Sequence, residues 1–341
     1  MNILLTSVGR RTYLIQYFKE AFRGKGKIHA CNSTETLGTL AADASFISPL
    51  VYDKEYIPTL ISYCKKESID AVLSLFDVDL LVLARNRKEF ANNGVKVLLA
   101  DENSILTCND KWRTHQFLQE NKIDSPATFL GLDHAKSAIA AGKLSYPVII
   151  KPRWGMASIG IHFADNVKEM DVLYAKSEKE AFDSHLKYES SLTPDRAIII
   201  QEALSGCEHG LDVLNDLEGN YVATFAKKKI AMRAGETDLG EIVSPAPFID
   251  ITRVLSNKIK HEALLSVDCF VNERGIYVTE LNCRISGHYP LSHLAGVNLP
   301  KQILYWLQGR GTDPSLLQCK EGVIVAKDLV PRIFNSRLAA S

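Results

Sequence analysis

Short apolar segments alternate with amphipathic ones through the first hundred residues. Patterns typical of buried strands lie at residues 2–6, 27–31, 45–51, 71–75 and 95–100, and helical patterns lie between them at 11–23, 58–66 and 78–90. The first helix gathers Leu14, Phe18 and Phe22 on one face, as a 3.6-residue period requires. Strands that alternate with helices form a parallel sheet covered by helices. We therefore predict an α/β fold for this part of the chain.

Charged residues follow two of the predicted strands. Arg10 and Arg11 come after the first strand, and Asp77 and Asp79 come after the fourth. Ligands of parallel sheets bind at the carboxyl ends of the strands, so these side chains are expected on one rim. The arginines can hold a carboxylate or phosphate by forked hydrogen bonds, although a solvated loop pair is the alternative. The turn SVGRR lacks the second and third glycines of a dinucleotide fingerprint, which argues against a nicotinamide-dependent dehydrogenase.

Residues 266–282 predict a β-hairpin with its turn at 272–275. Asp268 and Glu280 are equidistant from the centre of that turn, so they are expected to lie opposite each other. Asn282 is two residues from Glu280 and shares its face. Oxygen ligands of this kind suit Mg²⁺, which takes one or two carboxylates together with substrate phosphates. The alternative is a solvated hairpin face that carries a few acids.

Two lysines stand where a phosphate could bind. Lys111 lies in the first turn of a helix predicted at 109–119, where the helix dipole favours an anion rather than a cation, and a bound phosphate would explain it. Lys151 ends a strand at 148–150 and precedes a loop of small residues from Gly155 to Gly160. Such a loop can close its N–H groups over phosphates, although it is not a P-loop. The alternatives are a helix terminus at Lys111 that binds no phosphate and a plain glycine hairpin from Gly155 to Gly160.

The remaining elements are predicted from periodicity alone. Strands are expected at 161–164, 197–204, 208–213, 221–232 and 323–326, a helix at 299–308, and polar loops at 233–240 and 283–298. Lysines 227–229 lie on the strand at 221–232, and because lysines protect strand edges we predict a solvated edge strand there.

Composition restricts the partners and the compartment. The 341 residues contain 40 Lys and Arg and 40 Asp and Glu, so no basic field indicates nucleic acid or a membrane surface. The seven cysteines form no CxxC pair, which favours reduced thiols and a cytoplasmic location. No apolar run of about 18 residues is present, and the N-terminal apolar stretch is too short for a signal peptide.

The chain carries, in this order, Lys111, Lys151-Pro152, the small-residue loop, Gln201-Glu202, Glu208, Asp268, Glu280, Asn282 and Arg284. This order resembles that of the ATP-grasp superfamily, most closely its carbamoyl-phosphate-synthase-like carboxylate–amine ligases. The resemblance implies a pre-ATP-grasp Rossmann-like domain at 1–108. It also implies a two-lobed, α+β ATP-grasp domain, with a small lobe at 109–198 and a large lobe at 199–341.

The resemblance implies a role for each matching position. Lys111 and Lys151 would contact the α- and β-phosphates of ATP, and Gly155, Ser158, Ile159 and Gly160 would close over the β- and γ-phosphates. Adenine would meet Gln201, Glu202, Ala203 and Leu204, and ribose would meet Glu208. Asp268, Glu280 and Asn282 would hold one or two Mg²⁺ ions, for which Mn²⁺ can substitute. Arg284, Lys151 and Arg233 would act on the transferred phosphate, and the acid would bind near Arg10, Arg11, Asp77 and Asp79 or near Glu236 and Thr237.

The implied activity is ATP-dependent amide formation through an acyl phosphate, on an amino acid or a sugar acid. The alternatives are a carbamoyl-phosphate-synthase-like half that works with a partner chain, and an ATP-binding module without turnover. Asp268 stands where many relatives carry Glu, and Met156 and Ala157 replace smaller residues of the loop. Only one synthase-like unit and no ammonia-supplying domain are present. A homodimer is the assembly common among similar proteins.

Overall fold

The computed structural model describes residues 1–155, 158–332 and 334, and its strands form three sheets. Met156 and Ala157, two of the departures noted in the sequence, lie outside the described residues. Within that part of the chain, no helix has the length and apolarity to cross a membrane.

The N-terminal sheet is parallel, as predicted, with the strand order β3-β2-β1-β4-β5. Ile3 and Leu5 of β1 pack in the cluster that includes Leu14 and Phe18, whereas Leu4 packs in the cluster of Leu80 and Leu83. Successive side chains of a strand point to opposite faces, so both faces of the sheet are covered by helices. The strands are β1 (Ile3–Thr6), β2 (Ile28–Asn32), β3 (Ala44–Ile47), β4 (Ala71–Ser74) and β5 (Lys96–Leu98).

The helices of this unit differ from the prediction in two places, because α2 was not predicted and the helix at 78–90 is divided. The helix predicted at 78–90 is two helices, α4 (Asp77–Arg85) and α5 (Arg87–Asn92), which are separated at Asn86. Asn86 adopts a non-helical backbone conformation and its Nδ2 donates to the Val82 carbonyl, so its side chain competes with the helix ladder. The other helices are α1 (Thr12–Phe22), α2 (Leu37–Ala41) and α3 (Tyr56–Lys66).

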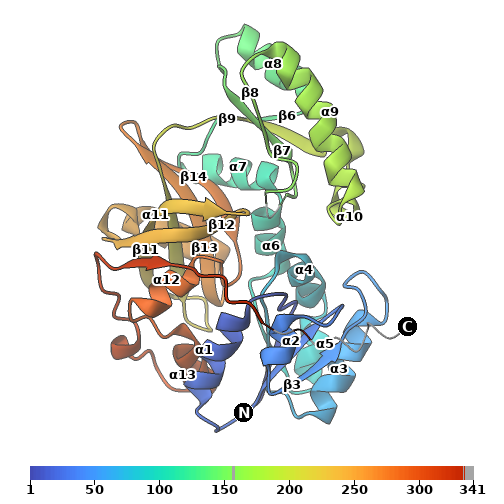
Figure 1. Cartoon of the computed structure of the whole chain (residues 1–341), viewed down its shortest axis with the longest axis vertical. Coiled ribbons are helices and arrows are strands. Elements are labelled where there is room, and N and C mark those ends of the chain that lie inside the picture. The colour runs from blue at the N-terminus through green and yellow to red at the C-terminus, as the bar shows by residue number, and fades with distance from the viewer. Residues whose placement is uncertain (156–157, 333, 335–341) are drawn as a thin grey trace.

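Helices α6 (Glu102–Asn109) and α7 (Lys111–Glu120) lead to a smaller four-stranded sheet of order β6-β9-β7-β8. This sheet and its helices stand at the top of Figure 1, with a core of their own around Val148, Ile150 and Ile200. The sheet continues through Glu202, beyond the predicted boundary at residue 198. Its elements are β6 (Thr128–Leu130), α8 (Leu132–Ala140), β7 (Val148–Pro152), β8 (His162–Ala164), α9 (Val167–Asp183), α10 (Lys187–Ser190), a 3₁₀ turn (Pro194–Arg196) and β9 (Ile198–Glu202).

The third sheet is antiparallel, with the order β14-β13-β10-β11-β12-β15. The predicted hairpin is present, and Asp268 pairs with Glu280 in its register, followed by an irregularity before Cys269. The strands are β10 (Cys207–Asn215), β11 (Tyr221–Arg233), β12 (Glu236–Val243), β13 (Ala263–Asn272), β14 (Gly275–Asn282) and β15 (Ile324–Ala326). The helices are α11 (Ile249–Ile259), α12 (Tyr289–Leu294) and α13 (Leu299–Leu307), with 3₁₀ turns at Ala246–Phe248 and Pro314–Leu316.

Three predictions for this sheet were wrong. Segment 233–240 is not a loop, because Ala234 and Gly235 make a tight turn with positive φ and β12 begins at Glu236. Segment 283–298 contains α12. Strand β11 is not an edge strand, since it pairs with both β10 and β12, and Lys227 on it is fully buried. Opposite charges from neighbouring strands neutralise these lysines, as described below.

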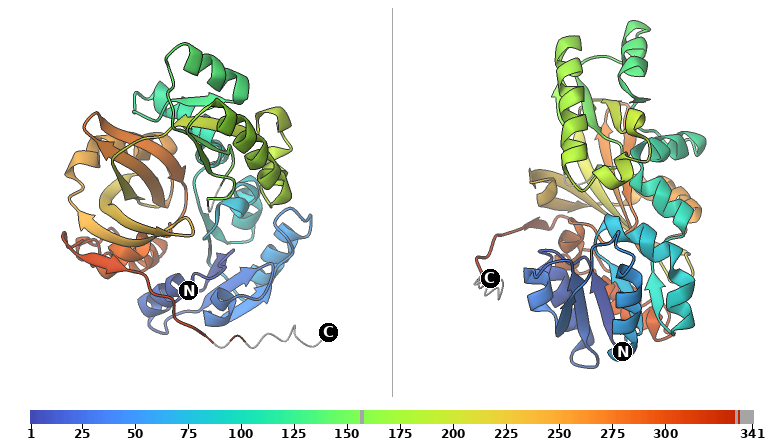
Figure 2. Two further views of the ribbon diagram at one scale, coloured as in Figure 1. Left: turned by 45° about the horizontal axis from the view of Figure 1, so that its top comes forward. Right: turned by 90° about the vertical axis from the view of Figure 1, so that its right-hand side faces the viewer.

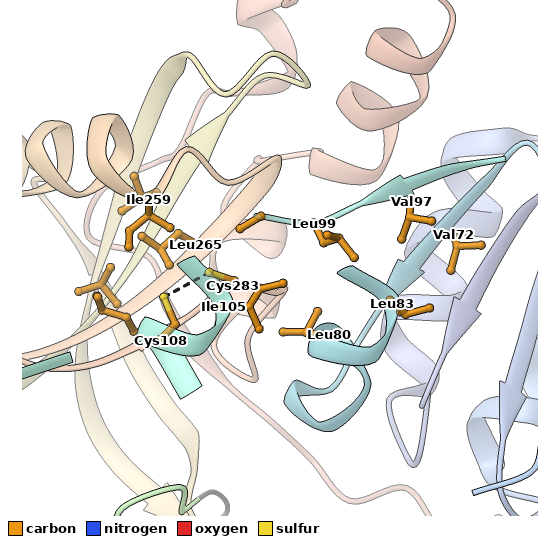
Figure 3. Close-up of a cluster of buried hydrophobic side chains, with 14 of the residues drawn as sticks. Val72, Leu80, Leu83, Val97, Leu99, Ile105, Cys108, Ile259, Leu265 and Cys283 are labelled. Carbon is orange, nitrogen blue, oxygen red and sulfur yellow. Dashed lines mark hydrogen bonds between the residues drawn. The ribbon is translucent and has the colours of Figure 1, made fainter. Parts of the chain in front are cut away.

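The N-terminal unit and the six-stranded sheet share one core. Figure 3 shows Leu80, Leu83 and Leu99 of the N-terminal unit approaching Ile105 and Cys108 of α6, which in turn pack toward Ile259, Leu265 and Cys283. The two views of Figure 2 show the smaller sheet projecting from this joint body. A separate upper lobe over a continuous lower body is an arrangement that could open and close on a ligand.

Candidate active site

Lys111 is placed by an ion pair between α7 and the end of β7. Asp110 caps α7 by accepting hydrogen bonds from the backbone of Trp112 and Arg113, and its two oxygens receive Arg153 Nε at 2.7 Å and Nη2 at 2.6 Å. The Lys111 amide donates to the Arg153 carbonyl at 3.0 Å. The Lys111 Nζ then donates to the Gly155 carbonyl and lies 3.0 Å from Glu280 Oε1. One lysine therefore links the glycine loop to the hairpin.

Lys151 is a buried cation near Lys111. It is the last residue but one of β7, is 9 % exposed, and its side chain makes no hydrogen bond or ion pair with any described residue. Burial, followed by the neighbouring charge of Lys111, lowers the pKa of Lys151 to about 8, although Glu280 and Glu208 act in the opposite direction. A cation that is buried at this cost needs an anionic partner, and a ligand phosphate can supply one.

The carboxylates of the hairpin have different partners. Glu280 faces Lys111, whereas Asp268 Oδ1 lies 2.7 Å from Lys229 Nζ, which is also 2.6 Å from Glu208 Oε1. Burial opposes the charge on Lys229, but Asp268 and Glu208 outweigh it and raise the pKa of this lysine. The same ion pair holds the pKa of Asp268 below its ordinary value against the effect of burial. Asp268 is thus neutralised by the protein itself.

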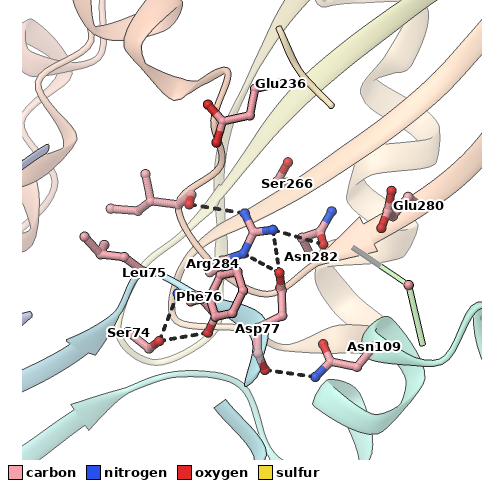
Figure 4. A network of polar contacts seen from close by, with 12 residues as sticks. Ser74, Leu75, Phe76, Asp77, Asn109, Glu236, Ser266, Glu280, Asn282 and Arg284 are labelled. Atoms are coloured by element: carbon pink, nitrogen blue, oxygen red, sulfur yellow. Dashed lines mark hydrogen bonds and ion pairs between the residues drawn. The ribbon is translucent and has the colours of Figure 1, made fainter. Parts of the chain in front are cut away.

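Arg284 joins the hairpin to the N-terminal sheet (Figure 4). Its Nε and Nη2 donate to Asp77 Oδ2 at 2.8 and 2.6 Å, and Nη2 reaches Asn282 Oδ1 at 3.4 Å. Asp77 begins α4, and its carbonyl accepts from Asn109 Nδ2 at 3.2 Å. The other carboxylate oxygen of Asp77 is buried and has no hydrogen-bond partner among the described residues. This oxygen remains able to accept a bond from a ligand.

A small pocket that is open to solvent lies where these groups meet. Its walls include five of the predicted residues, namely Asp77, Lys111, Gly155, Glu280 and Asn282, and also Asn109, Trp154 and Glu189. Lysine amines can bind phosphates, and carboxylate and amide oxygens can bind Mg²⁺. The described residues contain no group of three or more His, Cys, Asp or Glu arranged to hold a metal. The donors therefore fit a Mg²⁺ ion that takes its other ligands from phosphates or water.

A different set of predicted residues lies at the junction of β9 and β10. Gln201 Nε2 donates to Thr128 Oγ1 at 2.8 Å, and Glu202 is paired with Arg274 at 2.7 Å. Ala203 and Leu204 follow as the connection between the two sheets, and the Leu204 amide donates to no backbone carbonyl of the described chain. A planar base could bind such a free amide.

Comparisons with known proteins identify the family. An ATP-grasp domain model matches residues 108–288, and a model described as the PylC-like N-terminal domain matches residues 3–98. The chain belongs to the ATP-grasp family. The members of this family are ATP-dependent ligases that form C–N bonds, which is the class predicted from the sequence.

The curated relatives of this ATP-grasp chain include carbamoyl phosphate synthases. The arginine-specific large chain of Bacillus subtilis is 21% identical over 287 residues, and the large chain of a Thermoanaerobacter species is 23% identical over 283 residues. These matches cover 78% and 79% of this chain but 25% and 24% of the relatives. The chain thus spans about a quarter of the length of the curated relatives it matches.

Solved structures share the fold. Biotin carboxylase from Campylobacter jejuni superposes with a TM-score of 0.70 at 17% identity, covering 93% of this chain and 73% of that one. L-amino acid ligase from Bacillus licheniformis superposes with a TM-score of 0.65 at 19% identity, covering 90% and 74%. The predicted mixed α/β architecture of the ATP-grasp fold is thereby confirmed.

Some predicted residues of this ATP-grasp chain lie away from the pocket. Arg10 is exposed, and Arg233 pairs with Asp238 at 2.7 Å on the exposed β11–β12 turn. Asp79 is fully buried and accepts hydrogen bonds from four hydroxyls, including Thr6 Oγ1 at 2.6 Å and Ser7 Oγ at 2.8 Å, so a substrate cannot reach it in this conformation. Thr237 is buried on β12.

The structure describes Ser158, Ile159 and Gly160, the last three residues of the glycine loop. Ser158 and Gly160 adopt positive φ, whereas Ile159 lies in the turn between them. A Cβ on Gly160 would lie 2.9 Å from Pro152 Cγ, so only glycine fits there. Gly160 therefore lies tightly against Pro152, next to Lys151 on the same strand.

Sequence analysis missed a buried network beneath Asp268. Lys227 and Asp212 form an ion pair with no exposed surface, and Ser292 Oγ donates to Asp212 Oδ2 at 2.7 Å. His288 Nδ1 lies 3.2 Å from Asp212 Oδ1, and its Nε2 bonds Ser266 Oγ at 2.9 Å. The spacing of Lys227 and Lys229 could have indicated this network, because side chains two residues apart on a strand lie on the same face.

Proposed function

We propose that this protein is an ATP-dependent carboxylate–amine ligase that makes an amide through an acyl phosphate and releases ADP and phosphate. One observation carries the proposal: Lys111, Glu280, Asn282 and Asp77, which is paired with Arg284, line a single pocket between the smaller sheet and the lower body. Phosphoryl transfer needs positioned charge rather than a protein nucleophile, and this convergence offers it.

The nucleotide would lie along the junction of the two lobes. Lys111 and Lys151 would pair with its α- and β-phosphates, the loop from Gly155 to Gly160 would cover the β- and γ-phosphates, and Glu280 and Asn282 would hold Mg²⁺. The Lys111–Glu280 pair, 3.0 Å apart, supports this order, because a phosphate–metal unit presents the complementary charges. Bound Mg²⁺ would neutralise charge on the phosphates. Asp268 as a further ligand stays a prediction, since Lys229 already pairs with it.

The base and ribose would occupy the connection between the sheets. The free amide of Leu204 and the neighbouring backbone of Ala203 support a site for adenine, and the side chains of Gln201 and Glu202 hold this connection in place. Glu208 would accept from the ribose hydroxyls while it keeps its contact with Lys229.

The acid would attack the γ-phosphate through a carboxylate oxygen, and the bond to ADP would break. Arg284, held by Asp77 and next to Asn282, would stabilise the charge that develops on the transferred phosphoryl group. The smaller sheet, once closed, would exclude water from the acyl phosphate. An amine would then attack the acyl carbon, phosphate would leave, and the proton of the amine would pass to solvent.

The curated relatives favour a second candidate. Their names are those of carbamoyl phosphate synthase large chains, so a synthase-like unit that works with a partner chain is the alternative. Bicarbonate-dependent release of phosphate from ATP, with no organic acid and no amine present, would identify it. A homodimer and a cytoplasmic location remain predictions.

The test is ADP release with Mg²⁺ and ATP across a matrix of carboxylic acids and amines, with mass spectrometry of the products. An amide whose formation is stoichiometric with ADP supports the ligase. Glu280→Gln should lose most of this activity, whereas Glu273→Gln, an exposed acid on the turn of the same hairpin, should keep it. ATP binding with no product from any acid–amine pair would instead indicate a module without turnover.

A further inference from the structure

The two alternative acid-binding regions of the sequence meet in the structure. Arg11 follows β1 in the N-terminal unit, and Glu236 begins β12 of the six-stranded sheet. Arg11 Nη2 lies 3.8 Å from Glu236 Oε1, and Arg11 Nη1 donates to the Leu75 carbonyl, which fixes the guanidinium. Figure 4 shows Glu236 above Arg284 and Asn282 in the same close-up. Both regions therefore contribute to one site.

Lys327 adds a third charge to this site from the C-terminal segment. Its Nζ lies 3.1 Å from Glu236 Oε2 and 6.0 Å from the centre of the Tyr13 ring. Its amide donates to the Asp238 carbonyl at 2.7 Å, so the backbone is pinned to β12. Residue 327 lies beyond the matched ATP-grasp domain, which ends at residue 288. The family motifs therefore could not have indicated it.

Two hydroxyl groups in this region have no hydrogen-bond partner among the described residues. Tyr13 Oη and Ser286 Oγ are buried and make no hydrogen bond with any described residue. Tyr13 lies next to Lys327, and Ser286 precedes Gly287, where a Cβ would come within 2.9 Å of Glu236 Cδ. Buried hydroxyls are usually hydrogen-bonded, so an unpaired pair beside a charged cluster indicates a ligand with polar groups.

The charges of the cluster do not cancel. Arg11, Lys327 and Arg284 are cations, whereas Glu236 and Asp77 are the only acids paired with them in the described structure. Although burial raises the pKa of Glu236, Lys327 and Arg11 outweigh it and hold that pKa below its ordinary value, so the acid is ionised at neutral pH. One positive charge is therefore in excess. A bound carboxylate would balance this positive charge. An amino acid would bring an ammonium group as well as its carboxylate, so one positive charge would again be in excess.

We propose that Arg11, Glu236 and Lys327 form the binding site of the acid substrate, and that this acid is a hydroxylated carboxylic acid without an ammonium group. The two cations receive its anionic group, Glu236 orients them, and Tyr13 and Ser286 bond its hydroxyls. This inference rests on the proposed ligase activity. A zwitterionic amino acid would then serve as the amine substrate and not as the acid substrate.

The experiment uses matched pairs of acids in which a hydroxyl replaces an ammonium: lactate and alanine, glycerate and serine, gluconate and 2-amino-2-deoxygluconate. Each acid is incubated with the full chain, Mg²⁺, ATP and hydroxylamine, which traps an acyl phosphate as a hydroxamate with release of phosphate. Hydroxamate should form from hydroxy acids and not from their amino counterparts. Lys327→Ala should raise the half-saturating concentration of the reactive acid about tenfold or more.

Controls separate the site from the nucleotide chemistry. Lys327→Arg keeps the charge and should retain the affinity for the acid, and Lys320→Ala, an exposed lysine of the same C-terminal part, should change nothing. The dissociation constant of ATP should be the same in all these variants. Calorimetry that shows no ATP binding by the wild type would refute the proposed function instead.

Three outcomes would overturn the inference while ATP still binds. The first is hydroxamate formation from the amino acids in preference to the hydroxy acids. The second is an unchanged half-saturating concentration of acid in Lys327→Ala. The third is amide formation with ADP release from an acid that carries no hydroxyl group, together with no hydroxamate from any hydroxy acid of the panel.

Discussion

Lys151 offers a sharp test of the proposed nucleotide site, through the pH dependence of ATP binding. Burial and the charge of Lys111 lower its pKa from 10.5 to about 8. The difference corresponds to a cost of about 3 kcal/mol for keeping the amine charged in the free protein. A bound phosphate would offset that cost, because it supplies an opposite charge in addition to Glu280 and Glu208, which do not outweigh burial.

The direction of the effect follows from proton linkage. Below about pH 8 the free protein carries a charged Lys151 ready for phosphate, whereas above it the amine must regain a proton on binding, so ATP affinity should fall about tenfold per pH unit. The lowered pKa works in the other direction for stability. Between about pH 8 and 10.5 the unfolded chain binds the extra proton, so this lysine makes the protein more stable as the pH rises. The titration of Lys151 therefore does not unfold the protein as the pH rises, and such unfolding cannot be the cause of the weaker ATP binding.

Calorimetric titration of Mg²⁺ and ATP into the protein, from about pH 7 to 9.5, measures the effect. Lys151→Arg keeps its charge over this range and should give a flat profile, and Lys151→Met should bind weakly at every pH. Lys143→Met, which removes an exposed lysine of the same lobe, should behave as wild type. A flat profile in the wild type, or an equal decline in Lys151→Arg, would refute the reasoning.

Three further substitutions test other parts of the site. Glu280→Gln should raise the Mg²⁺ concentration for half-maximal ATP turnover about tenfold or more, because an anionic ligand is lost; an unchanged metal requirement would contradict its role. Arg284→Lys should lower kcat about a hundredfold with ATP affinity nearly unchanged, since a forked donor is lost where charge develops; a loss of affinity alone would argue against it. Lys227→Met should cost about 3–5 kcal/mol in urea unfolding, because the buried Asp212 loses its lysine partner and keeps only Ser292 and His288. The half-buried Lys228 should tolerate Met within about 0.5 kcal/mol, and similar values for both variants would show that burial of the pair is not responsible.

Much of the local structure was predictable because it depends on neighbours in the chain. The hairpin at 266–282 formed in the predicted register, since the centre of a turn determines which residues lie opposite each other. Lys111 was found in the first helical turn, next to its capping Asp110. The strand at 221–232 was also predicted, but its place in the sheet was not. Three consecutive lysines suggested an edge strand, and nothing in the segment indicates that Asp212, Glu208 and Asp268 lie on neighbouring strands.

The sequence by itself determined the chemical types of group available and their order along the chain: lysines at strand and helix ends, oxygen donors on a hairpin, glycines in a loop. Only the tertiary structure decided which charges meet. Lys111 contacts Glu280 across 169 residues, and Arg284 contacts Asp77 across 207. Coulomb attraction and hydrogen bonding act over a few ångströms of space, and packing of the sheets, rather than spacing in the chain, sets those distances.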